Sequence, residues 1–169
     1  MNIELIGYKT TFAQDLKADI ADFFAFHSGL VEAPEEEHQQ AEQEAAEILK
    51  DWQQDCSALY AILRDGGYAG FLRLRYRGDQ VAWIEDLYVR PQLRGQGIGS
   101  AAIGQAEAIV AARPGYTALC MDVSPRNEAA MRLYYRLGYD SVSLLTLRKE
   151  FGENRRDRKT EILGRTFHI

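Results

Sequence analysis

The segment Val89-Arg-Pro-Gln-Leu-Arg-Gly-Gln-Gly-Ile-Gly-Ser100 decides the fold, because it joins an apolar strand to a helix through three alternating glycines. Gly95, Gly97 and Gly99 lack a Cβ, so successive backbone N–H groups can turn toward one ligand where other residues would clash. The first N–H groups of the following helix have no partner within it, and its dipole adds partial positive charge there. The segment therefore predicts a binding site for a phosphate or pyrophosphate.

Spacing excludes two other glycine-rich phosphate-binding motifs. A Walker loop has a Lys-Ser or Lys-Thr pair after its last glycine, whereas Gly99 is followed by Ser100 and Ala101. A dinucleotide-binding fingerprint has the spacing G-x-G-x-x-G near the start of a βαβ unit, whereas the spacing here is G-x-G-x-G behind Arg94. The segment belongs to neither class of nucleotide site.

Composition indicates a globular chain with an acidic balance. The 169 residues are 46% apolar and 27% charged, with a formal net charge of −5. This length suits one domain whose core needs no disulfide or metal. Binding to nucleic acid needs a concentrated basic surface, so the charge argues against that partner and favours a cationic substrate. No stretch approaches the ~20 apolar residues of a membrane span, and the N-terminus lacks a signal-peptide pattern, so we expect a cytoplasmic protein with no membrane partner.

The cysteines and histidines show no ligand spacing. Cys56 and Cys120 lie far apart and have no CxxC or CxxH companion, which favours buried free thiols over zinc or redox chemistry. His27, His38 and His168 are equally scattered. We therefore expect no metal site.

Hydrophobic periodicity predicts alternating strands and helices along the chain. Strands are expected at 3–8, 58–63, 68–75, 81–89, 117–123, 139–149 and 162–167, and helices at 12–26, 34–52, 98–112 and 127–137. Arg64-Asp-Gly-Gly67 is typical of a tight hairpin turn. The nearly continuous apolar run at 117–123 predicts a central strand covered on both faces, and the polar run at 152–159 predicts an exposed loop.

Two motifs in this order resemble the GNAT N-acetyltransferase superfamily. The first is Arg94-x-x-Gly97-x-Gly99 after Leu87-Tyr88-Val89, and the second is Asn127-x-x-Ala130-x-x-Leu133-Tyr134-x-x-x-Gly138-Tyr139. The resemblance covers essentially the whole chain. It implies a single domain over residues 1–169, of α/β (α+β) class, with a mixed and mostly antiparallel central sheet of about seven strands flanked by about four helices.

The resemblance also implies acetyl-CoA as a cosubstrate. Its pyrophosphate is expected at Arg94, Gly95, Gln96, Gly97, Ile98, Gly99 and Ser100. Its pantetheine arm is expected at Leu87, Tyr88 and Val89, with Asn127 and Tyr134 also in contact. The arm would dock like an added strand where 81–89 parts from 117–123, because main-chain groups left unpaired there need partners.

Acetyl transfer to an amine needs an acid for the leaving thiolate and a base for the attacking ammonium. Tyr134 is the expected acid, because an unperturbed phenol with a pKa of about 10 keeps its proton at neutral pH. Glu85 is the expected base, directly or through water, by resemblance to polyamine-acetylating relatives. A carboxylate bonded only to backbone or to an arginine is the alternative for Glu85 and more so for Asp86. Strand alternation predicts that Glu85 and Asp86 lie on opposite faces of the sheet.

No motif names the acceptor, whose pocket is expected from residues 24–37, 73–77 and the last hairpin. The acidic helix start at Glu35–Glu37 is most simply solvated, but it slightly favours a small-molecule amine. The alternatives are acetylation of a protein N-terminus or lysine, and a CoA-binding module without turnover. The resemblance further implies a homodimer formed by the chain after Phe151, although no residue by itself points to one. The basic run Lys149–Lys159 is expected to be a solvated turn, and the alternatives are a contact with a dimer partner or with the 3′-phosphate of the coenzyme.

Overall fold

The structure is a computed structural model that describes the chain except for residues 29–34, 55–56, 78–79, 148, 150 and 152–157. The description of residues 25–28, 35–42 and 54 is limited to their backbone. The chain divides into two compact units, Met1–Asp122 and Val123–Ile169, and each unit is described by itself.

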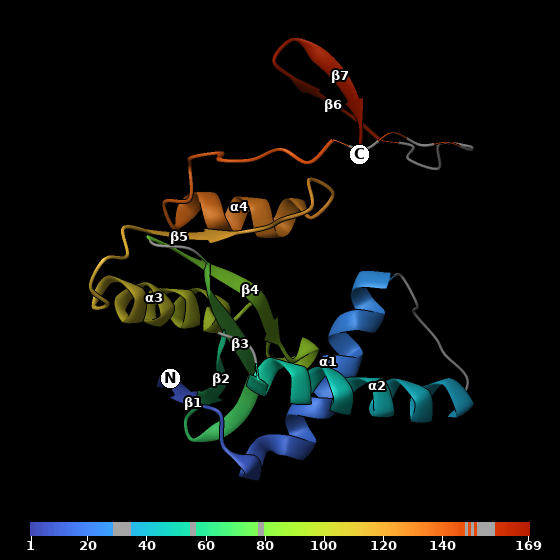
Figure 1. The fold of residues 1–169 in the computed structure, drawn as a ribbon, viewed down its shortest axis with the longest axis vertical. Coiled ribbons are helices and arrows are strands. Elements are labelled where there is room, and N and C mark those ends of the chain that lie inside the picture. Colours follow the sequence, from blue (N-terminus) through green and yellow to red (C-terminus); the bar gives the residue numbers. More distant parts are fainter. Residues whose placement is uncertain (29–34, 55–56, 78–79, 148, 150, 152–157) are drawn as a thin grey trace. The chain divides into compact units, whose positions relative to one another are not determined.

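The first unit contains a mixed sheet of five strands (Figure 1). In chain order its elements are β1 (Ile3–Gly7), a 3-10 turn (Thr10–Phe12), α1 (Ala13–Ser28), α2 (Glu35–Gln54), β2 (Ser57–Arg64), β3 (Gly67–Arg77), β4 (Val81–Val89), a second 3-10 turn (Pro91–Leu93), α3 (Ile98–Ala111) and β5 (Ala118–Met121). The strands lie in sequence order, with β1 to β4 antiparallel and β5 parallel to β4. The expected mixed, mostly antiparallel sheet is confirmed, but in the described residues it has five strands rather than about seven, and two further strands form a separate hairpin.

The predicted turn between β2 and β3 is confirmed, and its backbone explains the residues found there. Asp65 and Gly66 both have positive φ angles, of 49° and 84°. A two-residue hairpin turn with this hand matches the twist of the strands it joins, and it requires residues that tolerate a left-handed backbone. The Asp65 N–H also donates to the Asn2 carbonyl at 2.8 Å, which brings the start of β1 to the turn.

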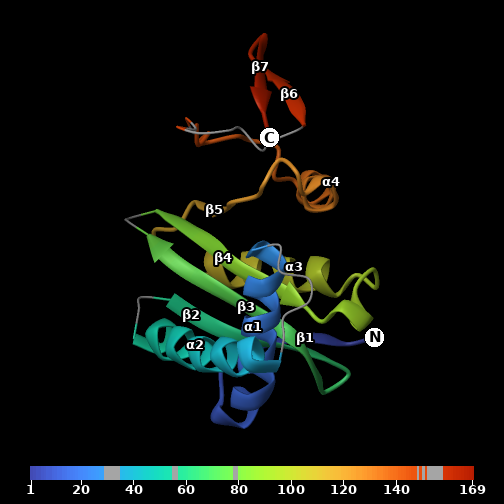
Figure 2. The same cartoon turned by 90° about the vertical axis from the view of Figure 1, so that its right-hand side faces the viewer.

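Helices cover both faces of the five-stranded sheet. Figures 1 and 2 show α1 and α2 on one face and α3 on the other. The core on the α1–α2 face consists of Leu16, Ile20, Ala45, Leu49, Trp52, Leu59, Phe71 and Tyr88. The buried residues of α3 are Ile98, Ala102, Ile103, Ala106 and Val110. The sheet is therefore the middle of three layers, and the candidate residues of β4 lie between two packed helix layers.

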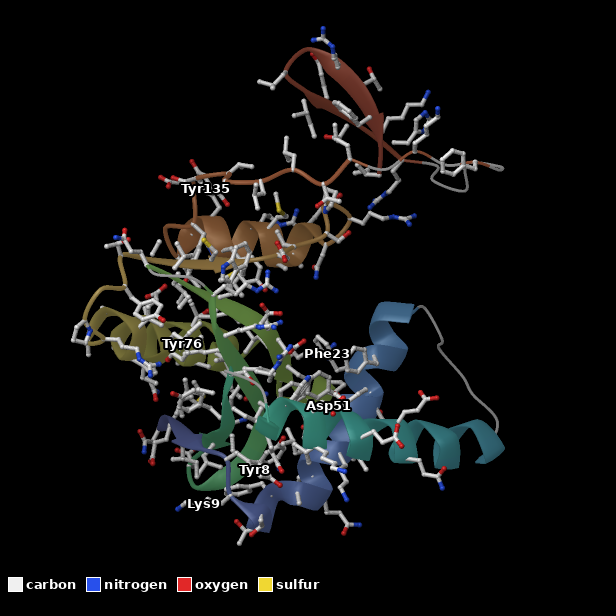
Figure 3. All side chains as sticks on the ribbon, viewed as in Figure 1. Tyr8, Lys9, Phe23, Asp51, Tyr76 and Tyr135 are labelled. Atoms are coloured by element: carbon white, nitrogen blue, oxygen red, sulfur yellow. The ribbon has the colours of Figure 1, made fainter. Side chains whose placement is uncertain are left out.

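Aromatic contacts mark the two faces (Figure 3). Phe23 of α1 packs edge-on against Phe71 and Tyr88, with centroid distances of 5.8 and 6.3 Å. Tyr76 lies on the α3 side, 5.2 Å from the ring of Tyr116. Side chains alternate between the two faces of the sheet, so the aromatic group around Phe23 lies on one face and the Tyr76–Tyr116 pair on the other.

The second unit contains α4 (Glu128–Arg136) and a hairpin of β6 (Lys159–Ile162) and β7 (Arg165–His168). The expectation of one strand at 162–167 is wrong, because Leu163 and Gly164 have φ angles of 50° and 70° and form the hairpin turn inside that run. Of the expected loop at 152–159, residues 152–157 lie outside the described residues, and β6 already begins at Lys159.

Two other strand expectations are wrong. The described residues of 139–149 form no strand, because a strand needs a hydrogen-bonded neighbour and none pairs with them in the described chain. The expected central strand at 117–123 is β5, which lies at an edge of the five-stranded sheet. An apolar run by itself does not distinguish an edge position from a central one.

We predict that Gly70→Ala destabilises the first unit. A Cβ at Gly70 would lie 2.0 Å from the Tyr88 carbonyl oxygen, so β4 would have to shift away from β3. Overpacking typically costs about 1–3 kcal/mol, and here the obstacle is backbone. Urea unfolding measures the loss. Gly104→Ala is the control, because nothing lies within 4 Å of its added Cβ, and a midpoint equal to that control would contradict the prediction.

Candidate functional site

β4 is paired along its whole length on one edge and along only part of it on the other. β3 pairs with β4 from Arg77↔Val81 to Gly70↔Val89. β5 pairs with β4 only as far as Ile84↔Met121. Among the described residues, β4 has no register partner in β5 beyond Ile84. The ladder therefore leaves main-chain groups on that edge for other partners, and one of them, the Val89 carbonyl, accepts from Arg94 Nε. The predicted parting of the two strands is therefore present.

The glycine segment has the backbone of an anion-binding turn. Gly95 and Gly97 have φ angles of 74° and 79°, a left-handed conformation that L side chains rarely adopt. Nothing lies within 4 Å of a Cβ built on either glycine, so the space beside them is open. Gly97 precedes the first residue of α3, and its carbonyl accepts the Ala101 N–H at 3.0 Å. The helix N-terminus therefore follows directly on two glycines, as an anion site requires.

In the remainder of the glycine segment, residues 98–100, mainly backbone groups can contact an anion. Gly99 lies in the first turn of α3, and the atom nearest to an added Cβ is Val89 Cγ2 at 3.9 Å, an ordinary contact. The conformational argument thus applies to Gly95 and Gly97, but not to Gly99. The Ile98 side chain is buried in the core, and Ser100 is half-buried. For Ile98 only the main chain can face a ligand.

Arg94 bonds to the end of β4, and Gln96 bonds to the end of β2. Arg94 Nε donates to the Val89 carbonyl at 2.8 Å, and its guanidinium lies 5.4 Å from the centre of the Tyr88 ring. Gln96 accepts a hydrogen bond from Arg64 Nη1 at 2.5 Å. Arg94 therefore places a positive charge at the end of β4, beside the glycines.

The three residues at the end of β4 differ in what they expose. Tyr88 is only 4% exposed, and its hydroxyl donates to Asp22 Oδ2 at 3.2 Å. Burial, together with the nearby carboxylates of Asp22 and Asp19, raises the pKa of Tyr88 to about 12. Its side chain belongs to the core, and its carbonyl oxygen faces Gly70 of β3, so neither is directed at the edge that β5 leaves. Leu87 and Val89 are half-buried.

Glu85 and Asp86 lie on the same face of the sheet, and the expectation that they face opposite ways is wrong. The register changes at this point from Arg73↔Asp86 to Leu74↔Ile84, which leaves Glu85 as the extra residue of a β-bulge. Arg73 contacts both carboxylates, with its Nε 2.6 Å from Asp86 and its Nη2 3.7 Å from Glu85. A bulge breaks the two-residue alternation, which is why both side chains meet one arginine.

A second arginine also holds Glu85. Arg77 Nη2 lies 2.5 Å from Glu85 Oε1, and the Arg77 guanidinium lies 5.0 Å from the Trp83 ring centre. The Glu85 side chain is 14% exposed. The two oxygens of this carboxylate therefore face one guanidinium each.

Sequence reasoning missed the contacts that hold the start of the turn. Arg90, the first residue after β4, donates to Asp19 Oδ1 at 2.9 Å and to Asp15 Oδ1 at 2.8 Å, both on α1. Burial raises the pKa of Asp19 even though Arg90 favours its charged form. A signal was present, since Asp15, Asp19 and Asp22 recur at the i, i+4, i+7 spacing of one helix face.

The role of Arg73 was also missed. The run 73–77 was expected to line an acceptor pocket, but Arg73 is buried, and its guanidinium lies 4.6 Å from the Trp52 ring centre. A strand position by itself does not show whether an arginine is solvated or paired inside the core.

In the second unit, Asn127 and Tyr134 belong to α4. Asn127 caps the helix, because its Oδ1 accepts the Ala130 N–H at 3.1 Å. Burial raises the pKa of the Tyr134 phenol. The Tyr134 carbonyl accepts the Tyr139 N–H at 3.0 Å, and Gly138 between them has a φ angle of 96°. The predicted stop of the helix at Gly138 is thus explained by its left-handed backbone.

Among the described residues, no three His, Cys, Asp or Glu side chains gather closely enough to hold a metal ion. No described helix combines the length and apolar character needed to span a membrane. Cys120 is a free thiol, and burial raises its pKa. Cys56 and the side chains of His27 and His38 lie outside the described residues.

We predict that Gly97→Ala lowers stability whereas Gly99→Ala does not. A left-handed backbone costs a non-glycine residue roughly 1–2 kcal/mol, and only Gly97 of this pair has a positive φ. Thermal unfolding should show a lower midpoint for Gly97→Ala, by about 2–4 °C per kcal/mol. Equal midpoints for the two variants would contradict the conformational argument.

The comparisons with known proteins agree with this geometry. The sequence matches the family model described as the Acetyltransferase (GNAT) family over residues 23–139. No functionally curated protein matches it.

Solved structures of similar fold cover most of the chain. A transcriptional regulator from Bacillus halodurans C-125 is 20% identical with a TM-score of 0.68, covering 89% of this chain and 100% of its own. PaiA N-acetyltransferase from Thermoplasma acidophilum, in complex with coenzyme A, is 18% identical with a TM-score of 0.61, covering 82% of this chain and 89% of its own. AAC(6')-Iy, in complex with the bisubstrate analogue CoA-S-monomethyl-acetylneamine, is 16% identical with a TM-score of 0.61, covering 89% of this chain and 99% of its own. Because the family model spans more than half of the sequence and includes both β4 and the glycine turn, the chain belongs to the GNAT acetyltransferase family.

Proposed function

We propose that the protein transfers an acetyl group from acetyl-CoA to a primary amine by direct attack in a ternary complex. One observation supports this most strongly: β4 leaves β5 after Ile84 and runs into a turn with left-handed glycines at Gly95 and Gly97 and a helix N-terminus. An open strand edge suits an amide-bearing arm, and the turn suits a diphosphate. Two structures of similar fold contain coenzyme A or a CoA-derived analogue, which supports the same ligand class.

The proposed contacts with the cosubstrate follow from these two features. The N–H groups of residues 95–100 would hold the pyrophosphate oxygens, and Arg94 would add charge beside them. The free edge of Leu87–Val89 would bond the amides of the pantetheine arm. Asn127 and Tyr134 of α4 are proposed to contact the same arm. A β4 N–H near Leu87 or Tyr88 would polarise the thioester carbonyl as charge develops on its oxygen.

The chemistry requires two proton movements. The amine nitrogen forms a bond to the carbonyl carbon, and the bond from that carbon to sulfur breaks. Glu85 is proposed to take the proton lost by the amine, directly or through water. Tyr134 is proposed to give a proton to the departing thiolate, and its raised pKa keeps the phenol protonated through the neutral range. No covalent acyl-enzyme is needed.

The proposed acceptor is a small-molecule amine. The net charge of −5 favours a cationic acceptor, and AAC(6')-Iy, which binds an acetylneamine analogue, has a similar fold. Three further expectations also remain proposals: one acetyltransferase domain over residues 1–169, a cytoplasmic location, and a homodimer formed by the C-terminal strands.

A free-thiol assay tests the proposal as a whole. Purified protein is mixed with acetyl-CoA and a panel of polyamines, aminoglycosides, amino acids and short peptides, and CoA release is followed. Calorimetry with acetyl-CoA runs in parallel. Binding without thiol release across the panel would point to a non-catalytic module, and release only with peptides would point to a protein acceptor. A protein that neither binds acetyl-CoA nor releases a thiol would overturn the proposal.

We predict that Tyr134→Phe lowers kcat by about 100-fold or more while acetyl-CoA binds nearly normally, because general acid catalysis commonly contributes at least that much. The matched control is Tyr135→Phe, which changes the neighbouring, 69% exposed phenol of the same helix. Turnover of Tyr134→Phe equal to that of the control would show that another group protonates the sulfur.

We predict that Glu85→Gln lowers kcat/KM for the best amine by about 100-fold, because the amide cannot accept the proton. The side chain of Gln has nearly the same shape and keeps one oxygen acceptor near Arg73 and Arg77, so the variant should fold. Glu47→Gln, on the exposed side of α2, is the control. A kcat/KM equal to that of the control would assign Glu85 to its arginine pairs alone.

A further inference from the structure

Arg73 joins two consecutive carboxylates across the β-bulge. Its Nε lies 2.6 Å from Asp86 and its Nη2 lies 3.7 Å from Glu85. On a regular strand these neighbours would point to opposite faces, and one side chain from β3 could not reach both. The double contact therefore exists only while β4 keeps its bulge.

The bulge coincides with the point where β4 and β5 part. Glu85 is the residue skipped in the pairing with β3, and Ile84 is the last residue paired with β5. Bulges bend a strand and increase its local twist, and they end pairing or re-aim groups beside active sites. The direction of the backbone from Leu87 to Val89 is thus set one or two residues after the bulge.

Arg73 is fixed on its other sides as well. It is 8% exposed, Asp86 is 8% exposed, and the face of the Trp52 ring lies 4.6 Å from the Arg73 guanidinium carbon. A guanidinium carries donors in a rigid fork, so it can hold two acceptors at a set angle where an ammonium cannot. The geometry of the bulge therefore requires the guanidinium of an arginine, and a positive charge by itself does not replace it.

We propose that Arg73 is a positioning residue for acetyl transfer: by bridging Glu85 and Asp86 it holds the β4 bulge and so aims the open Leu87–Val89 backbone at the thioester. This rests on the proposed function. The residue does not touch the substrate. Its effect on turnover passes through the position of main-chain groups, while the pyrophosphate turn at residues 94–100 lies further along the chain.

The first test is Arg73→Lys, which keeps the charge and loses the fork. We expect kcat to fall by about 100-fold, as for a misplacement of about 1 Å, while acetyl-CoA binding by calorimetry changes by less than about threefold. Amide hydrogen exchange in a peptide spanning β4 should be faster. The control is Arg113→Lys, the same change at an exposed arginine that follows α3. We expect its kcat to stay within about threefold of the wild type.

A second variant separates positioning from stability. Arg73→Met takes the guanidinium away from the buried Asp86 charge and is expected to unfold readily. Arg73→Met/Asp86→Asn removes that charge, so thermal stability should recover while kcat stays low and β4 exchange stays fast. Wild-type kcat in Arg73→Lys or in the stable double variant would overturn the proposal. An equal loss of kcat in Arg113→Lys would also overturn it, because the effect would then not depend on the β4 bulge.

Failure of this proposal differs from failure of the proposed function. If wild-type protein neither binds acetyl-CoA nor releases thiol, the function is wrong, and hydrogen exchange in β4 still reports whether Arg73 holds the bulge. If the wild type turns over and Arg73→Lys matches it in kcat and in β4 exchange, the function stands and the positioning role does not.

Discussion

The end of pairing between β4 and β5 after Ile84 is the constraint on which the candidate site depends. A full-length ladder would use the main-chain groups of both strands and leave nothing for a ligand to bond. A strand that simply left the sheet would instead lose its shape. Here β3 continues to pair with β4 as far as Val89, so the open edge is backed by a complete ladder. The site therefore combines a strand edge without a β5 partner with a rigid support.

Charged pairs on the α1–α2 face hold the two ends of this open segment. Arg73 meets Asp86 at its start, and Arg90 meets Asp19 of α1 just after its end. Between them, the buried hydroxyl of Tyr88 bonds to the same helix. Removing charge from water is costly unless the charges are paired with good geometry, so such contacts tolerate little movement. On its α1–α2 face, this part of β4 is therefore held by contacts with α1. Along its edge, no described residue of β5 pairs with it.

Much of the first unit was predictable from local pattern. The boundaries of β4 and the start of α3 are as expected, because strand periodicity, a run of glycines and helical periodicity follow one another without ambiguity. The turn at Asp65 and Gly66 was equally predictable, because both residue types tolerate a positive φ angle. Predictions failed where a strand depends on a partner. The described part of 139–149 is rich in apolar residues yet unpaired, and the run at 162–167 contains a turn.

The family, the order of elements around the glycine turn and the class of ligand could be argued from the sequence by itself, because they depend on residue types at short spacing. The tertiary structure decided which face Glu85 occupies and which charges surround it. That outcome depends on a bulge between β3 and β4, and a bulge is a property of how two strands pair. The burial of Arg73 likewise depends on Trp52 and Asp86, which lie on other elements. Contacts between residues distant in sequence arise only when the chain has folded, and local spacing carries no record of them.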